Sequence, residues 1–379
     1  MVHLLHRTVL SERVVRLALG AAGRLTTPLL PDDYLALADP LLSRRCPAGR
    51  VAEVRTATTD TVTLVIRPGH GWRPARRAGQ YTPVGVRIGG VLHWRTYSLT
   101  TPPGAPGAPF SITVKALPDG RVSRYLAHRL RPGDVLRLGP AQGDFHLPDP
   151  PPRRLLLLTA GIGITPVMAM LRALAGGARL APGTDVLLVH SAPDPARTVF
   201  GPELRAMEEH LPWFRLHEHH TRAGVRPAGH LTPALLPAVC PDWRERDTWA
   251  CGPTALLTAA ERHWAAEGLA DRLRIERFRP APPPPSGTVG GKGQGGTRVH
   301  FAASDVTADT GPGTPLLHAG EAAGVAMPSG CRMGICYGCV SPLLHGRVRD
   351  LRTGQVHGEP GDLIQTCVSA PHGPVTLDL

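Results

Sequence analysis

The pattern of apolar and polar positions changes its character along the 379-residue chain. Between residues 51 and 138, short β-rich runs are separated by Gly/Pro turns, as in Val62–Ile66 and Ser111–Val114. Similar runs lie at Val51–Val54, Val84–Ile88 and Val135–Leu138. Many short strands at such spacing are typical of a small antiparallel barrel.

After residue 150 the pattern becomes one of continuous apolar runs that alternate with helical stretches. Leu155–Leu158 leads through a glycine-rich turn into a helix predicted over Pro166–Ala175, and Val186–Val189 precedes a helical stretch at Pro202–His210. A later strand, Thr248–Cys251, opens into another helix. Buried strands that alternate with helices predict an α/β doubly wound parallel sheet.

The N-terminal end carries an apolar stripe at near-helical spacing, with arginines between its members. Its residues are Leu4, Leu5, Val9, Leu10, Val14, Val15 and Leu17. The stripe has two interpretations, a helix packed on the next domain and a helix lying in a membrane interface. Pro31 and Pro40 then mark a short connecting segment. Further on, Pro280–Gly296 has the composition of a polyproline spacer followed by a flexible linker.

Four cysteines near the C-terminus have the spacing of an iron–sulfur ligand set. Cys331, Cys336 and Cys339 follow the pattern C-x4-C-x2-C, and Cys367 lies further on. This spacing is that of plant-type [2Fe–2S] ferredoxins, whose cluster carries single electrons at roughly −400 mV. Glycines between the ligands, Gly334 among them, let the loop wrap closely and aim N–H groups at the sulfurs.

Zinc binding and disulfide formation are the two other uses that such thiols have. Zinc also accepts four thiolates, but zinc sites usually pair two short C-x2-C motifs, and the second is missing here. A disulfide framework is disfavoured because the chain is large and shows no secretory signal. The remaining thiols, Cys46, Cys240 and Cys251, are odd in number and scattered, which fits a reducing cytoplasm.

The charge distribution narrows the class of partner. The net charge is +12, whereas Thr297–Leu379 alone carries −2, so a basic body precedes a mildly acidic tail that could dock on it. No basic groove interleaved with aromatic residues is visible, which disfavours nucleic acid. No uncharged run of 18 apolar residues occurs, so we expect no membrane span and a cytoplasmic protein, at most peripheral to a membrane.

A candidate flavin motif, Arg95-Thr96-Tyr97-Ser98, ends a predicted barrel strand. An arginine beside a pyrophosphate, a tyrosine stacked on the isoalloxazine ring and a hydroxyl near flavin N5 would form a flavin site. Gly120-Arg121-Val122-Ser123 follows and opens a helix whose N-terminal amides can hold a phosphate. Taken singly, Tyr97 could be a half-buried aromatic residue of a strand, and Arg95 could belong to a surface ion pair. The occurrence of both motifs in this order favours a flavin site.

A second candidate site joins two strand ends of the parallel sheet. The glycine loop Thr159–Pro166 follows a buried strand and opens a helix, which is the context that a dinucleotide-binding loop requires. Cys251-Gly252-Pro253 ends a later strand at the same edge, where ligands bind in such folds. The thiol of Cys251 can lie against a nicotinamide ring, or it can be a small buried apolar group.

These residues, in this order, resemble the ferredoxin–NADP reductase superfamily over Val51–Phe278, followed by a β-grasp ferredoxin over Thr297–Leu379. The resemblance implies FAD, with FMN less favoured, held by Arg95, Thr96, Tyr97, Ser98, Lys115, Gly120, Val122 and Ser123. It implies nicotinamide contacts from Gly161, Gly163, Thr165, Pro166, Gly252 and Pro253. It also implies catalytic roles for Ser98, Cys251 and Glu276, an acidic residue that the family keeps near the reacting ring.

The resemblance implies a multidomain chain. It predicts a helical N-terminal extension (1–45), an antiparallel β-barrel flavin-binding domain (46–150), an α/β doubly wound NAD(P)H-binding domain (151–280), a Pro/Gly linker (281–296) and an α+β β-grasp [2Fe–2S] ferredoxin domain (297–379). Electrons would pass from NAD(P)H through FAD and the cluster to a one-electron acceptor protein.

The identity of the acceptor stays open at this point. The extension, with Pro31–Leu35, resembles reductases that feed membrane acyl-CoA (fatty acid) desaturases, while the domain order resembles bacterial oxygenase reductases. The alternatives are a reductase of a soluble Rieske or diiron aromatic-ring oxygenase and a redox-sensing iron–sulfur protein. A sensor should carry an output element, and none is visible.

The coenzyme's 2′-phosphate would be recognised after the second strand of the parallel sheet. Relatives that select it often place an arginine there, whereas His190–Arg197 has proline at that position. Ser191 and Arg197 remain available, so NADPH is favoured and NADH stays an alternative.

Overall fold

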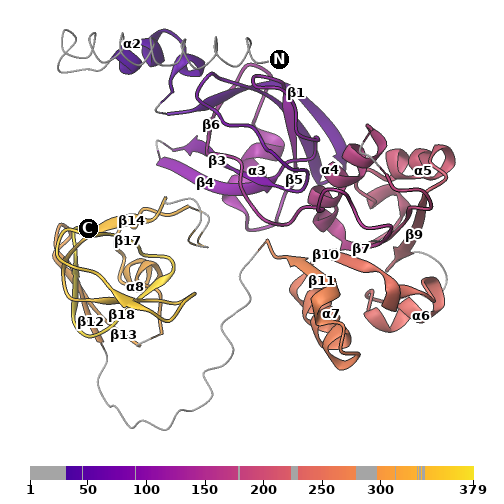
Figure 1. The fold of residues 1–379 in the computed structure, drawn as a ribbon. Helices are drawn as coiled ribbons and strands as arrows, with labels where there is room; N and C mark the ends of the chain where they lie inside the picture. Colours follow the sequence, from indigo (N-terminus) through magenta and orange to yellow (C-terminus); the bar gives the residue numbers. More distant parts are fainter. Residues whose placement is uncertain are drawn as a thin grey trace, which may run out of the picture.

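The computed structural model describes residues 31–44, 46–89, 91–177, 180–222, 229–278, 297–311, 313–330, 332, 334 and 338–379. Figure 1 shows their helices and strands in three successive domains. The predicted apolar stripe between Leu4 and Leu17, the linker 281–296 and the candidate ligands Cys331 and Cys336 lie outside the described residues.

The segment predicted as a connection between Pro31 and Pro40 contains two short helices. They are α2 (Pro31–Ala38) and the 3-10 helix η1 (Pro40–Leu42), each of which begins with a proline, a residue that suits the first helical turn. The Asp39 side chain accepts a hydrogen bond from the Leu41 amide and caps η1. A Cβ at Gly69 of the barrel would lie 2.3 Å from the Leu41 carbonyl oxygen, so this end of the extension packs closely on the barrel.

The first large domain is the predicted antiparallel barrel. Its strands are β1 (Ala48–Thr58), β2 (Thr61–Pro68), β3 (Tyr81–Ile88), β4 (Val91–Ser98), β5 (Phe110–Lys115) and β6 (Val135–Leu138). They form one six-stranded sheet in the order β4-β3-β6-β1-β2-β5, and a bridge between Leu99 and Ile112 joins the two ends. Helix α3 (Arg121–His128) buries Val122 and Leu126 in the barrel core.

The second domain has the predicted doubly wound parallel sheet. Its strands are β7 (Arg154–Ala160), β8 (Asp185–Ala192), β9 (Phe214–His220), β10 (Asp247–Cys251) and β11 (Leu273–Glu276), in the order β11-β10-β7-β8-β9. Its helices are η2 (Gly161–Gly163), α4 (Ile164–Ala175), η3 (Pro195–Arg197), α5 (Gly201–His210), η4 (Pro233–Leu235), α6 (Leu236–Val239), η5 (Trp243–Glu245), α7 (Thr254–Ala266) and η6 (Ala270–Arg272).

The strand order of this sheet explains both its sequence pattern and the place of its site. Leu155 and Leu157 belong to the core on one face, and Leu156 and Leu158 to the core on the other, so the strand reads as a continuous apolar run. The order reverses between β7 and β10, and open α/β sheets bind ligands beyond the strand ends at such a reversal.

The third domain combines strands with a helix, in keeping with the predicted α+β β-grasp fold. Its elements are β12 (Thr297–Phe301), β13 (Val306–Thr310), α8 (Leu316–Ala322), β14 (Val340–His345), β15 (Val348–Asp350), β16 (Val356–His357), β17 (Leu363–Gln365), β18 (Ser369–Pro371) and β19 (Val375–Leu377). One sheet has the order β13-β12-β19-β14-β17, in which β12 runs parallel to β19, and a smaller one has the order β16-β15-β18.

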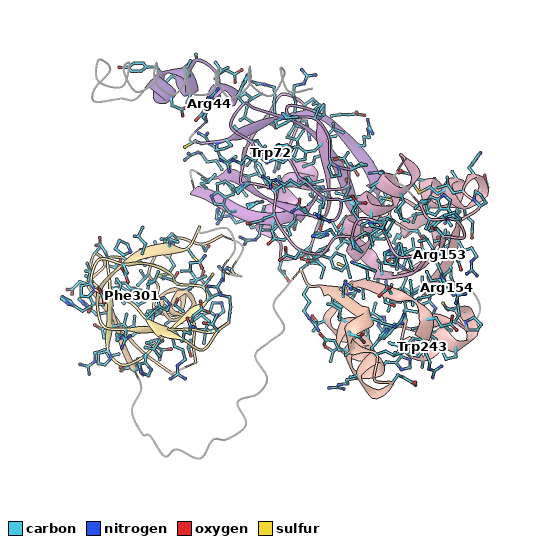
Figure 2. All side chains as sticks on the ribbon, viewed as in Figure 1. Arg44, Trp72, Arg153, Arg154, Trp243 and Phe301 are labelled. Atoms are coloured by element: carbon cyan, nitrogen blue, oxygen red, sulfur yellow. The ribbon has the colours of Figure 1, made fainter. Side chains whose placement is uncertain are left out.

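Each domain has its own apolar core. Figure 2 shows Trp72 inside the barrel, Trp243 inside the parallel-sheet domain and Phe301 inside the ferredoxin domain, and all three are buried. The first two domains also pack on each other, because Arg172 of α4 donates to the Thr100 carbonyl of the barrel and Trp249 of β10 donates to the His146 carbonyl. The glycine loop of the parallel-sheet domain also lies at this junction, because η2 contacts β5 of the barrel.

Candidate functional site

Strand β4 places the candidate flavin residues at the edge of the barrel sheet. Arg95 and Tyr97 are two residues apart, so they lie on one face of the strand, and Thr96 lies on the other. Burial raises the pKa of the Tyr97 phenol, although the charge of Arg95 acts in the opposite sense. Ser98 ends the strand and is buried. An un-ionised tyrosine on an apolar barrel wall suits a flat aromatic ligand.

The structure adds His93 and Arg121 to this group. His93 lies on the same face of β4 as Arg95, and burial lowers the pKa of its imidazole, which the charges of Arg121 and Arg95 lower further. Its Nε2 atom is buried without a hydrogen-bond partner among the described residues. A pyrophosphate would suit the two guanidinium groups, and a proton on this buried nitrogen would let it donate to a phosphate oxygen as well. A sequence signal for His93 exists, because side chains two positions apart in a strand lie on the same face and His93 is two positions before Arg95.

In the candidate phosphate-binding turn before α3, the Ser123 hydroxyl forms hydrogen bonds with the backbone of the turn itself. Ser123 Oγ donates to the Gly120 carbonyl and accepts from the Leu117 amide, at 3.2 Å in both cases. A Cβ at Gly120 would lie 2.2 Å from that hydroxyl oxygen, so a larger residue there would displace the Ser123 side chain from these hydrogen bonds. Val122 is buried in the barrel core. Lys115 forms an ion pair with Asp60, at 3.2 Å, beside the turn between β1 and β2.

The nicotinamide candidates converge where the parallel sheet reverses its strand order. A Cβ at Gly163 would lie 2.2 Å from the Cys251 carbonyl oxygen, so the loops after β7 and β10 touch backbone to backbone. Gly161 has a φ of 55°, in the left-handed region that favours glycine. Thr165 Oγ1 donates to the Ile162 carbonyl at 2.9 Å and fixes the turn.

The remaining members of this loop pair have supporting positions. Pro166 is buried in the first turn of α4. Gly252 lies against Ala160, because a Cβ on it would come 3.2 Å from the Ala160 amide nitrogen. Pro253 is the residue from which α7 begins. Together they keep the two strand ends close enough for one ligand to contact both.

Cys251 and Glu276 are neighbours across the strand pair β10–β11. Burial raises the pKa of the Cys251 thiol well above its usual value, and the charge of Glu276 adds to this, so the thiol is neutral. Burial, followed by repulsion from Asp144, raises the pKa of Glu276 to about 7. A carboxyl group that titrates near neutrality can take up or release a proton at this edge.

The candidate 2′-phosphate residues lie at the carboxyl end of β8, Ser191 within the strand and Arg197 beyond it. Ser191 is buried in the strand, and the Arg197 guanidinium donates to Asp194 Oδ2 at 2.7 Å. The structure also brings Arg222 to this place, since its amide donates to the Pro193 carbonyl and its side chain is exposed. The sequence did not indicate Arg222, because Arg222 follows β9 and comes near the segment after β8 only through the pairing of β9 with β8.

The cluster candidates are described in part. Cys339 and Cys367 are buried, and their sulfur atoms lie 3.2 Å apart. The Gly334 amide donates to Cys367 Sγ at 3.3 Å, and backbone N–H groups aimed at the ligand sulfurs are typical of iron–sulfur sites. Among the described residues no group of three or more His, Cys, Asp and Glu could hold a metal ion, so the ligand set of four stays a prediction. Arg95 of β4 donates to the Gly330 carbonyl, which brings this loop to the flavin strand.

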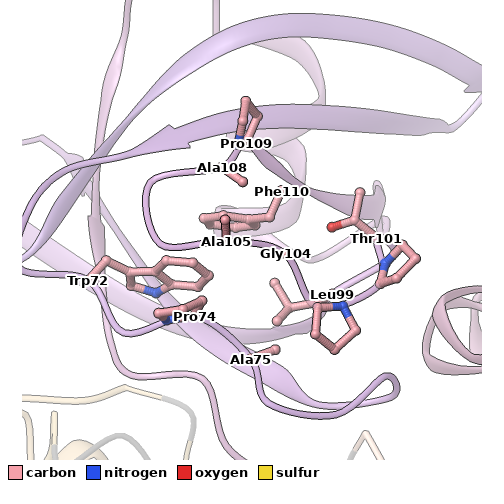
Figure 3. A pocket seen from close by; sticks show the side chains of 12 residues that line it. Trp72, Pro74, Ala75, Leu99, Thr101, Gly104, Ala105, Ala108, Pro109 and Phe110 are labelled. Carbon is pink, nitrogen blue, oxygen red and sulfur yellow. The ribbon is translucent and has the colours of Figure 1, made fainter. Parts of the chain in front are cut away.

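A separate hollow lies on the barrel (Figure 3). Its lining is mostly apolar and consists of Trp72, Pro74, Ala75, Leu99, Thr101, Pro102, Pro103, Gly104, Ala105, Ala108, Pro109 and Phe110. The rings of Trp72 and Phe110 stack at 4.3 Å in its wall. None of the candidate site residues lines it. In the described part of the chain, no helix has the length and apolar character needed to cross a membrane.

Three family models match successive parts of the chain. They are the oxidoreductase FAD-binding domain at residues 54–147, the oxidoreductase NAD-binding domain at 157–262 and the 2Fe-2S iron-sulfur cluster binding domain at 299–372. The chain is also 48% identical, over 360 residues, to a Mycobacterium tuberculosis protein named NADPH oxidoreductase, covering 94% of this chain and 91% of that protein.

Other similar proteins include the glycine betaine monooxygenase reductase subunit of Pseudomonas aeruginosa, which is 30% identical and covers 80% of this chain and 87% of its own length. Among solved structures, phthalate dioxygenase reductase shares the fold, with a TM-score of 0.53, 22% identity and coverage of 88% of this chain and 97% of that one. An intact type IV self-sufficient cytochrome P450 monooxygenase matches with a TM-score of 0.57 and 26% identity, covering 88% of this chain and 41% of that one.

Three cofactor-binding domains in one chain define an electron-transfer reductase. The chain belongs to the ferredoxin–NADP reductase superfamily, within the group that carries a [2Fe–2S] domain. It is an NAD(P)H-dependent oxidoreductase that uses FAD and a [2Fe–2S] cluster and serves an electron-accepting partner, as the sequence predicted. The cofactors supply the redox chemistry, and the chain supplies binding, orientation and electrostatics.

Proposed function

We propose that this reductase delivers electrons from NADPH to a membrane-bound acyl-CoA desaturase or a similar oxygenase. The observation that carries the proposal is the exposed apolar surface of α2, formed by Tyr34, Leu35 and Leu37, with Leu37 77% exposed. Asp32 accepts hydrogen bonds from Ser43 Oγ and the Arg44 amide, which hold α2 against the segment just before β1. An apolar surface held in this way suits contact with a membrane or a membrane protein.

The comparisons bear on the extension and on the class of acceptor. The match to the mycobacterial NADPH oxidoreductase covers 94% of the chain, and the remainder is shorter than the 45 residues of the extension. At least part of the extension is therefore shared with that relative. The relative named as a glycine betaine monooxygenase reductase subunit covers 80% of the chain and favours the alternative, a reductase of an oxygenase. Supplying the reductase and NADPH to desaturase-containing membranes, and measuring acyl desaturation, tests the acceptor directly.

Within the chain, we assign the hydride-transfer roles to Ser98, Cys251 and Glu276. Ser98 ends the flavin strand, and the other two lie side by side at the nicotinamide edge. The neutral Cys251 thiol would pack against the coenzyme ring, while Glu276, with its pKa of about 7, would exchange a proton with the site. Arg95, His93 and Arg121 would hold the flavin's pyrophosphate.

Membrane binding should depend on α2 and on the extension before it. The full chain should float with anionic liposomes at low salt, and Leu35→Ser/Leu37→Ser should bind less, because apolar burial and charge both contribute to such binding. A chain starting at Pro31 measures the share of the preceding residues. Val135→Ser, on an exposed barrel position, serves as the matched control. Parent protein that stays in solution at low salt would remove the local support for a membrane partner.

The preference for NADPH should depend on the exposed guanidinium groups near the β8 end. Arg197→Ala and Arg222→Ala should each lower the NADPH-to-NADH ratio of kcat/KM by roughly tenfold, about 1.4 kcal/mol, the scale of one charged hydrogen bond. Arg215→Ala is the control, because Arg215 pairs with Asp185 at the start of the neighbouring strand. A ratio unchanged in both variants would remove these arginines from coenzyme selection.

A further inference from the structure

Gly334 lies between the candidate ligands Cys331 and Cys336 in the sequence, and both its amide and its carbonyl group form hydrogen bonds. Its amide donates to Cys367 Sγ at 3.3 Å. Its carbonyl oxygen accepts from Arg352 Nη1 at 3.1 Å and from Gln365 Nε2 at 2.9 Å. The Gly334 amide thus contacts a candidate ligand sulfur, while its carbonyl oxygen contacts the Arg352 guanidinium group.

The fit around Gly334 is close. Its φ is 72°, and a Cβ would lie 2.5 Å from Arg352 Nη1 and 2.9 Å from Val368 Cγ2. Glycine is therefore required both for the backbone conformation and for the approach of Arg352. The Arg352 side chain occupies the space beside the loop, and this contact joins residues 18 positions apart in the sequence.

Arg352 is itself held in place. Its Nη2 donates to Asp350 Oδ2 at 2.6 Å and its Nε to Oδ1 at 3.2 Å, while the amides of Arg352 and Thr353 also donate to Oδ1. The hydrogen bond from the Arg352 side chain is the main cause that lowers the pKa of Asp350 to about 2. Arg352 Nη2 also donates to Gln365 Oε1 at 3.3 Å, which turns the amide nitrogen of Gln365 toward Gly334.

We propose that Arg352 and Gln365 are positioning residues that fix the cluster loop and raise the reduction potential of the [2Fe–2S] centre. The proposal rests on the ligand set assigned to Cys331, Cys336, Cys339 and Cys367. Cluster potentials follow net charge and the hydrogen bonds to the sulfurs. Reduction adds negative charge, so a nearby cation and a correctly directed amide both favour the reduced form.

The test compares Arg352→Gln with Arg349→Gln in the full chain. Both remove one positive charge, but Arg349 contacts His372 rather than the cluster loop. Iron content is measured first, and the potential follows from a redox titration monitored by electron paramagnetic resonance. Arg352→Gln should lower the ratio of reduced to oxidised cluster roughly tenfold at a fixed potential, equivalent to about 59 mV for one electron. Arg349→Gln should leave it near the parent value.

A second readout separates positioning from charge alone. Arg352→Lys keeps the charge but loses the planar fork, so it should release iron to a chelator faster than the parent and Arg349→Gln. Equal potentials and equal release rates in the Arg352 and Arg349 variants would overturn the proposal. If Arg352→Gln loads no iron, Gln365→Leu takes its place, and an unchanged potential there overturns it as well. A parent protein without iron would instead refute the ligand set.

Discussion

Cys339→Ser should reduce the NADPH-driven reduction of cytochrome c to background and leave the reduction of bound flavin by NADPH nearly unchanged. Cys339 is buried 3.2 Å from Cys367 in the ferredoxin domain, and a serine hydroxyl is a poor substitute for a thiolate ligand. The nicotinamide loops and the flavin strand belong to the other two domains, whose cores are separate. Stopped-flow absorbance of the flavin, beside a steady-state cytochrome c assay, measures both steps.

Cys46→Ser is the matched control for this experiment. Cys46 is an exposed thiol before β1 and outside the assigned ligand set, so its loss should change neither step. Two results would contradict the proposed order of electron transfer. One is normal cytochrome c reduction by a Cys339→Ser protein that contains no iron, and the other is loss of flavin reduction in a variant that retains its flavin and its melting temperature.

The local signals in the sequence were sufficient for the architecture of the first two cofactor domains, whereas the fold of the third was predicted from a resemblance to ferredoxins. The strand-rich runs predicted the barrel, and the glycine loop after Leu155–Leu158 predicted the loop at the reversal of the parallel sheet. These features depend on neighbours along the chain, on strand period and on glycine in tight turns. The prediction of a helical extension over residues 1–45 spans α2 and η1 but did not place them individually, because Pro31 and Pro40 suit a turn as well as a first helical turn.

Contacts between distant segments could not be predicted in the same way. Arg222 approaches the segment after β8 because β9 lies beside β8, and Arg352 reaches Gly334 from the turn after β15. The ion pair of Lys115 with Asp60 likewise depends on the pairing of β2 with β5. Such contacts are set by sheet register and side-chain direction, which a single sequence does not reveal without a template for the fold.

Gly163→Ala should slow the reduction of flavin by NADPH at least about tenfold, the effect of losing roughly 1.4 kcal/mol of transition-state stabilisation. Gly163 has an ordinary helical φ, so the cost does not come from backbone strain. It comes from space, since the added Cβ would lie 2.2 Å from the Cys251 carbonyl oxygen. The loops after β7 and β10 must then separate, and both the glycine loop and Cys251 move relative to the coenzyme ring.

The control is Gly313→Ala in the ferredoxin domain. A Cβ at Gly313 would have no atom within 4 Å, so the substitution adds the same methyl group without a steric clash. Flavin content and melting temperature show whether each variant is folded, and chemical reduction of the flavin shows that it remains redox-active. The expected signature of Gly163→Ala is a folded flavoprotein whose flavin is reduced chemically but slowly by NADPH. Parent-like NADPH kinetics would mean that the two strand ends can separate without consequence, and that the contact between Gly163 and Cys251 does not shape the nicotinamide site.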